Sequence, residues 1–273
     1  MSYKLPNRKR LIRNLPHIWD VNDLIECIDS HKNKTAFKYF ENGNLREMTY
    51  SQFLDMIKSV AAAIFKFGLE GKRIAVIGDT SPEWLATYVG TIAAGSIIIP
   101  MDKELALAEV EKFLTMVEAD AVVYSSSFNE KFVTTVNTHP TLKYFIPIHA
   151  DYDSSFSSKV IPFSDFIEVG KEEVEKGYKI KTVRNREVMC EMLFTSGTTG
   201  TSKCVMLCQK NIFAAVTSAV ETVCFSPDDV VVSVLPVHHT YELMCLLAEM
   251  VYGITICIND SLRHVLKNFA LFK

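Results

Sequence analysis

Short apolar runs that alternate with helical patterns most strongly constrain what this chain can fold into. Residues 73–78 read RIAVIG, the pattern of a buried strand, and SPEWLATYVGTIAAG at 81–95 follows with Ser81 and Pro82 at its start and Gly95 at its end. That order of residues is typical of a helix. The same alternation continues through 96–100, 106–120, 121–125, 128–139 and 143–148. It predicts an α/β fold with mostly parallel, doubly wound sheets flanked by helices.

The segments on either side extend this pattern. Residues 49–68 predict an amphipathic helix, with Thr49 and Gln52 as a capping box and Gly68 at its end. Residues 151–159 predict a polar loop, and 170–177 a solvated helical face before a turn. The later chain predicts strands at 204–207, 229–237 and 254–260 and helices at 209–223, 241–253 and 264–273. We therefore divide it into an N-terminal segment (1–70), a βαβ unit (71–150) and a second half (185–273).

Composition excludes several classes of protein. The 273 residues are 48% hydrophobic and carry a net charge of -3. A nucleic-acid partner would call for a basic face, and this charge gives no indication of one. No apolar run approaches the roughly 20 residues of a transmembrane segment, and the basic cluster at 8–10 is interpreted as a solvated terminus. Seven cysteines without a CxxC pair favour a reduced, cytoplasmic location and buried thiols rather than a metal site.

A run of Thr, Ser and Gly that ends on a lysine, TSGTTGTSK at 195–203, lies between two apolar segments. Glycines let a backbone approach a ligand closely, and hydroxyls, loop amides and an ammonium group together suit a polyphosphate. The spacing differs from a Walker loop, because Thr201 and Ser202 separate Gly200 from Lys203. The alternative is a flexible polar hairpin turn. The candidate phosphate ligands are Thr195, Ser196, Gly197, Thr198, Thr199, Gly200 and Lys203.

This run resembles the phosphate-loop signature of the adenylate-forming (ANL) superfamily, which contains acyl-CoA synthetases. MTYSQF at 48–53 and AAGSIIIPMD at 93–102 resemble further segments of that family in the right order. LPVHHTYE at 235–242 resembles an element of bacterial long-chain fatty acyl-CoA synthetases. The resemblance implies an incomplete N-terminal large domain of the adenylate-forming fold, with the C-terminal domain absent.

The resemblance also implies a reaction. A carboxylic acid, most simply a fatty acid, would attack the α-phosphorus of Mg²⁺-bound ATP to give an acyl-adenylate, and coenzyme A would then displace AMP. This is the activity of an AMP-forming acid–thiol ligase. Lys203 and the loop would hold the β- and γ-phosphates, and His239 would lie where the α-phosphate and the acyl carboxylate meet. The full-length protein would carry out this reaction, and the chain alone is expected to be inactive.

Some residues keep more than one interpretation. Cys204 replaces a family glycine and adds a Cβ there, and Cys208–Gln209 replaces the usual Ser/Thr–His. His238 and His239, if they lie on a strand, point to opposite faces, which excludes a shared metal. Glu242 fits a first-turn acid that favours the helix dipole, or a polar anchor beside the acyl site.

Two hypotheses remain for the whole chain. In the first, it is the front part of an acyl-activating enzyme. In the second, it is a non-catalytic fragment or interaction module that pairs with a separately encoded half. In either case, this chain would expose apolar surface that further residues would otherwise cover. Exposed apolar surface predicts a homo-oligomer.

Overall fold

The computed structural model describes residues 16–149, 157–183, 185–195, 202–223, 225–226 and 228–272. Its first half contains α1 (Val21–Ser30), β1 (Thr35–Glu41), β2 (Asn44–Thr49), α2 (Tyr50–Lys66), β3 (Arg73–Ile77), α3 (Pro82–Ala93), β4 (Ile97–Met101), α4 (Leu107–Met116), β5 (Ala121–Ser125), η1 (Ser126–Phe128), α5 (Asn129–Val133) and β6 (Tyr144–Ile148). Its second half contains α6 (Phe163–Glu175), β7 (Met189–Thr195), β8 (Lys203–Cys208), α7 (Gln209–Thr222), β9 (Val230–Ser233), α8 (Thr240–Tyr252), β10 (Thr255–Ile258), η3 (Leu262–His264) and α9 (Val265–Leu271).

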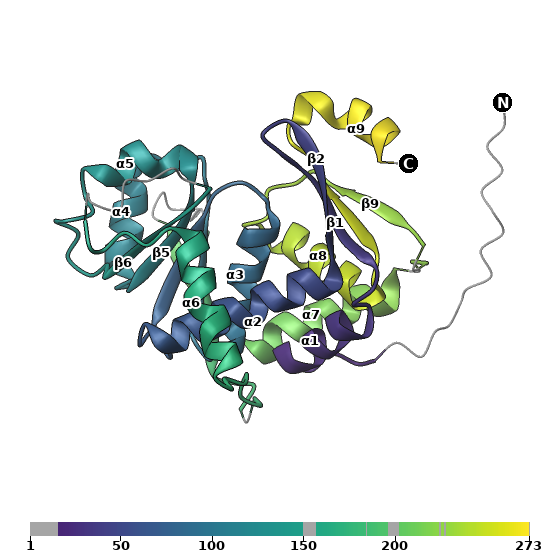
Figure 1. Cartoon of the computed structure of the whole chain (residues 1–273), viewed down its shortest axis with the longest axis horizontal. Coiled ribbons are helices and arrows are strands. Elements are labelled where there is room, and N and C mark those ends of the chain that lie inside the picture. The colour runs from purple at the N-terminus through teal and green to yellow at the C-terminus, as the bar shows by residue number, and fades with distance from the viewer. Residues whose placement is uncertain are drawn as a thin grey trace.

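The larger sheet is built from the predicted alternation of strands and helices. Its strand order is β6-β5-β3-β4-β7-β8. All neighbours pair in parallel except β7 and β8, which form an antiparallel edge. Helices α4 and α5 lie on one side of this sheet, at the left of Figure 1, and α3 lies on the other. The α/β fold with mostly parallel sheets is therefore confirmed.

The smaller sheet joins the two ends of the described chain. Its order is β2-β1-β10-β9, and β1 pairs in parallel with β10, so that Phe37 lies opposite Ile256. The β1–β2 hairpin and α1 were not among the predicted elements. Their local patterns are short, and β1 becomes a central strand only because β10 pairs with it across more than 200 residues of chain.

Two hydrophobic clusters cover the two faces of the larger sheet. One packs α4 and α5 against it through residues such as Phe113, Phe132 and Phe145. The other lies between the sheets and contains side chains of α1, α2, α3, α7 and α8. Figure 1 shows α2 and α3 running between the sheets. The helical stripe predicted at 49–68 is thus core, and its capping box is present, since Thr49 accepts a hydrogen bond from Gln52 N at 3.2 Å.

One sequence interpretation is corrected. Strand β9 ends at Ser233, and His238 and His239 lie on the turn before α8, where their ring centroids are 4.2 Å apart. They do not point to opposite faces, because a turn lacks the alternation of a strand. The solvated helical face predicted at 170–177 agrees with the structure, in which α6 ends at Glu175 before a turn and only Gly170 of this stretch is buried, against α2. The polar loop predicted at 151–159 falls mostly outside the described residues, as does the basic cluster at 8–10.

Gly170 sets the distance between α2 and α6. A Cβ built at this position would lie 1.9 Å from the backbone oxygen of Ser59, which a helix cannot easily withdraw. We expect Gly170→Ala to lower the free energy of unfolding by about 1–3 kcal/mol, the usual cost of overpacking, although alanine is the better helix former. Chemical denaturation measures this change. The control Glu175→Ala, exposed on the same helix, should stay within about 0.5 kcal/mol, and equal stability of both variants would contradict the close crossing.

Candidate functional site

The carboxyl ends of the parallel strands gather polar residues at one edge of the larger sheet. Asp79 follows β3, Asp102 follows β4, Ser125 ends β5, His149 follows β6 and Thr195 ends β7. Ligands of open α/β sheets bind outside this edge. Gly78 is required here, because a Cβ on it would lie 1.8 Å from Ser125 Oγ, which accepts a hydrogen bond from Asp79 N at 2.9 Å.

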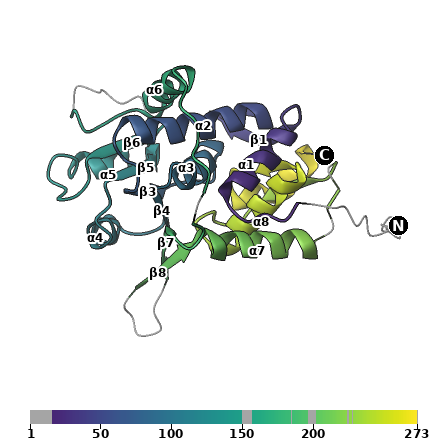
Figure 2. The same cartoon turned by 90° about the horizontal axis from the view of Figure 1, so that it is seen from below.

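The predicted phosphate run joins β7 to β8. Thr195 and Lys203, its first and last residues, are directly opposite each other in the antiparallel register. Opposite residues in such a pair project from the same face, so the hydroxyl and the ammonium group flank one side of the loop. Figure 2 shows this edge hairpin beside α7. Ser196, Gly197, Thr198, Thr199 and Gly200 lie outside the described residues, so their part in the site stays a prediction.

Alternation along β7 identifies which face this is. Phe194 stacks on Phe113 of α4, with ring centroids 4.0 Å apart and planes 10° apart. Glu191, on the opposite face, accepts a hydrogen bond from the Tyr88 hydroxyl of α3 at 3.1 Å. Thr195 has the parity of Glu191. Thr195 and Lys203 therefore project from the face that α3 covers, which is the side of the sheet toward the smaller sheet.

The Lys203 side chain is exposed and makes no ion pair or hydrogen bond with another described residue. Nearby exposed lysines differ in this respect. Lys210, at the start of α7, pairs with Glu187 at 2.9 Å. The Lys203 ammonium is thus available to an anion that binds at this face.

The departures from the family pattern have structural explanations. Cys204 lies opposite Phe194 and packs against the cluster under α4, so its added Cβ points away from the face of Lys203. Cys208 caps α7 together with Asn211, whose Oδ1 accepts from Cys208 N at 3.1 Å. Gln209 is buried and accepts a hydrogen bond from Val21 N at 3.0 Å, which joins α7 to α1.

The second predicted site residue, His239, is the N-cap residue of α8 and is exposed. Its neighbour His238 is largely buried, and His238 Nε2 lies 3.6 Å from Oδ2 of Asp102, which follows β4. Strand β4 is the neighbour of β7. The histidine turn and the phosphate-loop ends are therefore brought to the carboxyl ends of adjacent strands.

Glu242 anchors the segment that leads to this turn. It is 7% exposed, and its carboxylate accepts a short hydrogen bond from the Ser233 hydroxyl at the end of β9. Burial raises the pKa of Glu242, against the lowering effect of its hydrogen bonds with Ser233 and the Leu235 backbone. These bonds hold Glu242 to the end of β9, and Glu242 also lies in the first turn of α8; a role beside an acyl site stays a prediction.

Two ion pairs at the same edge were not found by sequence reasoning. Lys103 pairs with Asp79, which raises the pKa of Lys103 mainly through their hydrogen bond. His149 Nε2 lies 3.4 Å from Glu83 at the start of α3, and this contact raises the pKa of His149. The only sequence signal for these two pairs was the position of their residues, which lie just after a strand or at the start of a helix at the carboxyl edge.

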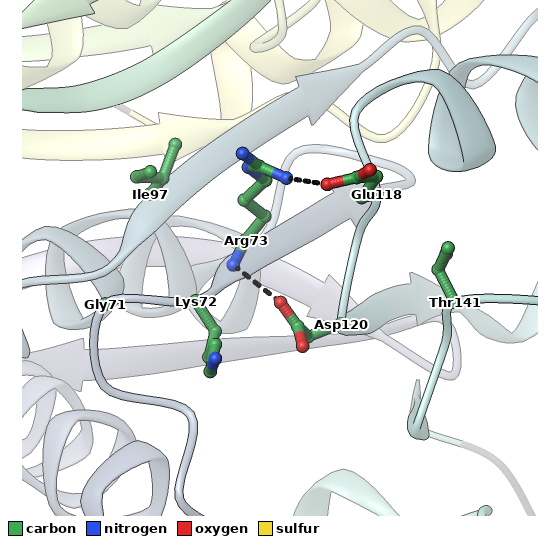
Figure 3. A pocket seen from close by; sticks show the side chains of 7 residues that line it. All are labelled: Gly71, Lys72, Arg73, Ile97, Glu118, Asp120 and Thr141. Carbon is green, nitrogen blue, oxygen red and sulfur yellow. Dashed lines mark hydrogen bonds and ion pairs between the residues drawn. The ribbon is translucent and has the colours of Figure 1, made fainter.

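A separate pocket of about 420 Å³ lies at the opposite, amino-terminal edge of the sheet. It is lined by Gly71, Lys72, Arg73, Ile97, Glu118, Asp120 and Thr141, shown in Figure 3. Its charges are largely satisfied internally, because Arg73 pairs with Glu118 at 2.8 Å and Asp120 with Lys143 at 2.9 Å. No predicted site residue lines it.

Three further findings bear on the site. The described residues contain no cluster of three His, Cys, Asp or Glu side chains that could hold a metal ion. The cysteines within the described ranges are free thiols. Among the helices of those ranges, none has the length and apolarity that crossing a membrane requires.

Comparison with known proteins assigns this arrangement to a class. Residues 25–272 match the family of AMP-binding enzymes, and the chain belongs to that family. It is similar to Long-chain-fatty-acid–CoA ligase ACSBG1 of Rattus norvegicus, with 27% identity over 243 residues, 86% of this chain and 34% of that protein. The Homo sapiens ligase of the same name is 26% identical over 89% of this chain and 35% of its own length. The chain thus spans about a third of the length of these relatives.

Solved structures share the fold. The anthranilate CoA ligase AuaEII, in complex with anthranoyl-AMP, aligns with a TM-score of 0.81 and 20% identity over 95% of this chain and 49% of that one. ATP-bound MatB from Rhodopseudomonas palustris aligns with a TM-score of 0.71 and 21% identity over 92% of this chain and 48% of that one. At these identities the likeness shows the adenylate-forming fold alone.

Helix α8 carries a buried acid that makes stability depend on pH. Glu249 is 8% exposed, its Oε2 has no hydrogen-bond partner among the described residues, and burial raises its pKa to about 8. Between about pH 4.5 and 8 the unfolded chain releases a proton that the folded chain retains, so stability falls as pH rises. We expect Glu249→Gln to flatten this decline and to stabilise the chain at pH 8.5 by about 1–4 kcal/mol.

Urea denaturation at pH 5.5 and pH 8.5 measures this effect. Glu221→Gln, a change at an exposed position of α7, should leave the decline as it is in the wild type. A Glu249→Gln variant that loses as much stability as the wild type over this interval would show that Glu249 is ionised in the fold.

Proposed function

We propose that this chain is the nucleotide-binding part of an AMP-forming acid–thiol ligase that activates a carboxylic acid of the fatty acid class. The full-length protein would convert the acid to an acyl-adenylate and then to acyl-CoA. Membership of the AMP-binding family and the names of the fatty-acid–CoA ligase relatives support this proposal.

One observation carries the proposal furthest. Thr195 and Lys203 lie opposite each other in the β7–β8 hairpin, and the histidine turn reaches the carboxyl end of the neighbouring strand β4 through His238 and Asp102. A hydroxyl, an ammonium group without a partner among the described residues and the intervening Gly/Thr run are suited to a polyphosphate tail. His239 is the N-cap residue of α8. At this position it would meet the α-phosphate, whose negative charge the dipole of α8 would favour.

The residues would act mainly through position and charge. Lys203 would neutralise the pyrophosphate as it leaves, and Thr195 would donate its hydroxyl to the same phosphates. His239 would hold the α-phosphate and the incoming carboxylate together. Such groups accelerate the reaction by stabilising charge that develops in the transition state, so no protein nucleophile is needed.

Two cosubstrates belong to the proposal by family alone. Mg²⁺ would accompany ATP, and its partial neutralisation of the phosphates would assist the departure of pyrophosphate. Coenzyme A would accept the acyl group. No described residue is assigned to either one.

The alternative is a binding module that takes up a nucleotide without activating an acid. It would need only phosphate-binding groups, such as Thr195 and Lys203 at the two ends of the loop. Acid-dependent ATP–pyrophosphate exchange distinguishes the two, because only an activating enzyme catalyses it. Exchange with a panel of fatty acids would support the ligase in the full-length protein, and its absence with every acid tested would support the binding module.

The role of Lys203 can be tested on the 273-residue chain by calorimetric titration with Mg²⁺-ATP. We expect Lys203→Ala to weaken binding by about 10- to 100-fold, since a charge-assisted hydrogen bond contributes about 1.5–3 kcal/mol. Lys210→Ala is the matched control, because Lys210 is exposed a few residues away and already paired with Glu187. An unchanged affinity in the Lys203 variant would remove this lysine from the phosphate site.

We also propose that copies of the chain associate. Leu262 and Leu266 in η3 and α9 are 75% and 87% exposed, and Phe269 continues this apolar stripe. Light scattering should show dimers or larger species at high concentration, and Leu266→Glu should shift them toward monomers. A clean wild-type monomer across the concentration range would contradict the association.

A further inference from the structure

We propose that Asp102 and His238 form a positioning pair that fixes the ring of His239 at the carboxyl edge of the larger sheet. The pair connects two segments distant in the sequence, the residue that follows β4 and the turn before α8. Its geometry is independent of any ligand, whereas its consequence for nucleotide binding rests on the proposed function.

Asp102 is oriented toward the histidine by its own loop. Its Oδ1 accepts a hydrogen bond from Glu104 N at 2.9 Å, which leaves Oδ2 as the oxygen nearest His238. The adjacent Lys103 is engaged with Asp79 after β3, with a longer contact of 3.8 Å to Glu104. Asp102 therefore retains its capacity to pair with His238.

The ring of His238 also contacts the ring of His239. The two rings are tilted by 45° with centroids 4.2 Å apart, and the His238 side chain is only 11% exposed. Its Nε2 is buried without a hydrogen-bond partner among the described residues and lies 3.6 Å from Asp102 Oδ2. A movement of about 0.6 Å would bring these atoms to hydrogen-bonding distance. His238 thus contacts both the segment after β4 and the ring of the predicted site residue.

Charged groups of both signs surround His238. Asp102 and Glu104 face it from the segment after β4, Lys103 faces it from the same segment, and His239 is the neighbour on its own turn. Burial is the largest influence and lowers the pKa of His238, so the neutral ring is the form that this site favours. A neutral imidazole with its proton on Nε2 would donate to Asp102 Oδ2 once the two atoms reach hydrogen-bonding distance.

The test uses the 273-residue chain and reads the His239 imidazole signals by NMR without ligand. We expect Asp102→Ala and His238→Ala each to shift these signals, and the double variant to shift them no further, because the two side chains act as one unit. Asp102→Asn should restore the wild-type signals, since its side-chain amide can still hydrogen-bond with His238 from the same position and the His238 ring is kept. Circular dichroism verifies that each variant is folded.

A second histidine–aspartate pair provides the control. His264 Nδ1 lies 2.8 Å from Asp260 Oδ2 at the start of α9, away from the turn, and His264→Ala should leave the His239 signals in place. Unchanged His239 signals in the Asp102 and His238 variants, or shifts that simply add in the double variant, would overturn the pair. Failure of Asp102→Asn to restore the signals would also overturn it.

Titration with Mg²⁺-ATP separates this inference from the proposed function. If both hold, Asp102→Ala and His238→Ala weaken binding by about five- to tenfold without adding in the double variant, and Asp102→Asn binds as the wild type does. A wild-type chain that binds no ATP, but shows the predicted His239 shifts, supports the positioning pair and refutes the proposed function. Weakened binding without any shift of the His239 signals overturns the pair alone.

Discussion

The antiparallel pairing of β7 with β8 is the constraint on which the candidate site depends. Every other described neighbour pair in the larger sheet is parallel, so β8 returns beside β7 and brings Lys203 opposite Thr195. The stack of Phe194 on Phe113 holds one face of this hairpin against α4. Because side chains alternate along a strand, that stack also determines that Thr195 and Lys203 project from the opposite face.

The second constraint is the connection between the two sheets. The smaller sheet includes β1 from the start of the described chain and β9 and β10 from near its end, and α2 and α3 lie between it and the larger sheet. The hydrogen bond between Ser233 and Glu242 holds the two ends of the turn after β9 together, and His238 of this turn contacts Asp102 after β4. His239 thereby lies at the carboxyl edge even though its strand belongs to the other sheet.

The sequence predicted the regular parts of this fold because their signals are local. Ser81 and Thr49 start helices with hydrogen bonds that the residue types predict, and continuous apolar runs became the central parallel strands. The β1–β2 hairpin was missed because its position depends on pairing with β10. The strand assigned through residue 237 was too long, since nothing in its apolar pattern shows that the chain turns after Ser233. The candidate residues Thr195, Lys203 and His239 could be named from their motifs, but the contact of His238 with Asp102 required the tertiary structure.

The central claim is that a nucleotide binds at the carboxyl edge of the larger sheet, between the hairpin and the histidine turn. Its most direct test is the backbone amide spectrum of isotope-labelled chain titrated with Mg²⁺-ATP. The claim predicts that the signals of Thr195, Lys203 and His239 move together with one dissociation constant. Movement confined to Lys72, Glu118 and Asp120, at the amino-terminal edge, would contradict it.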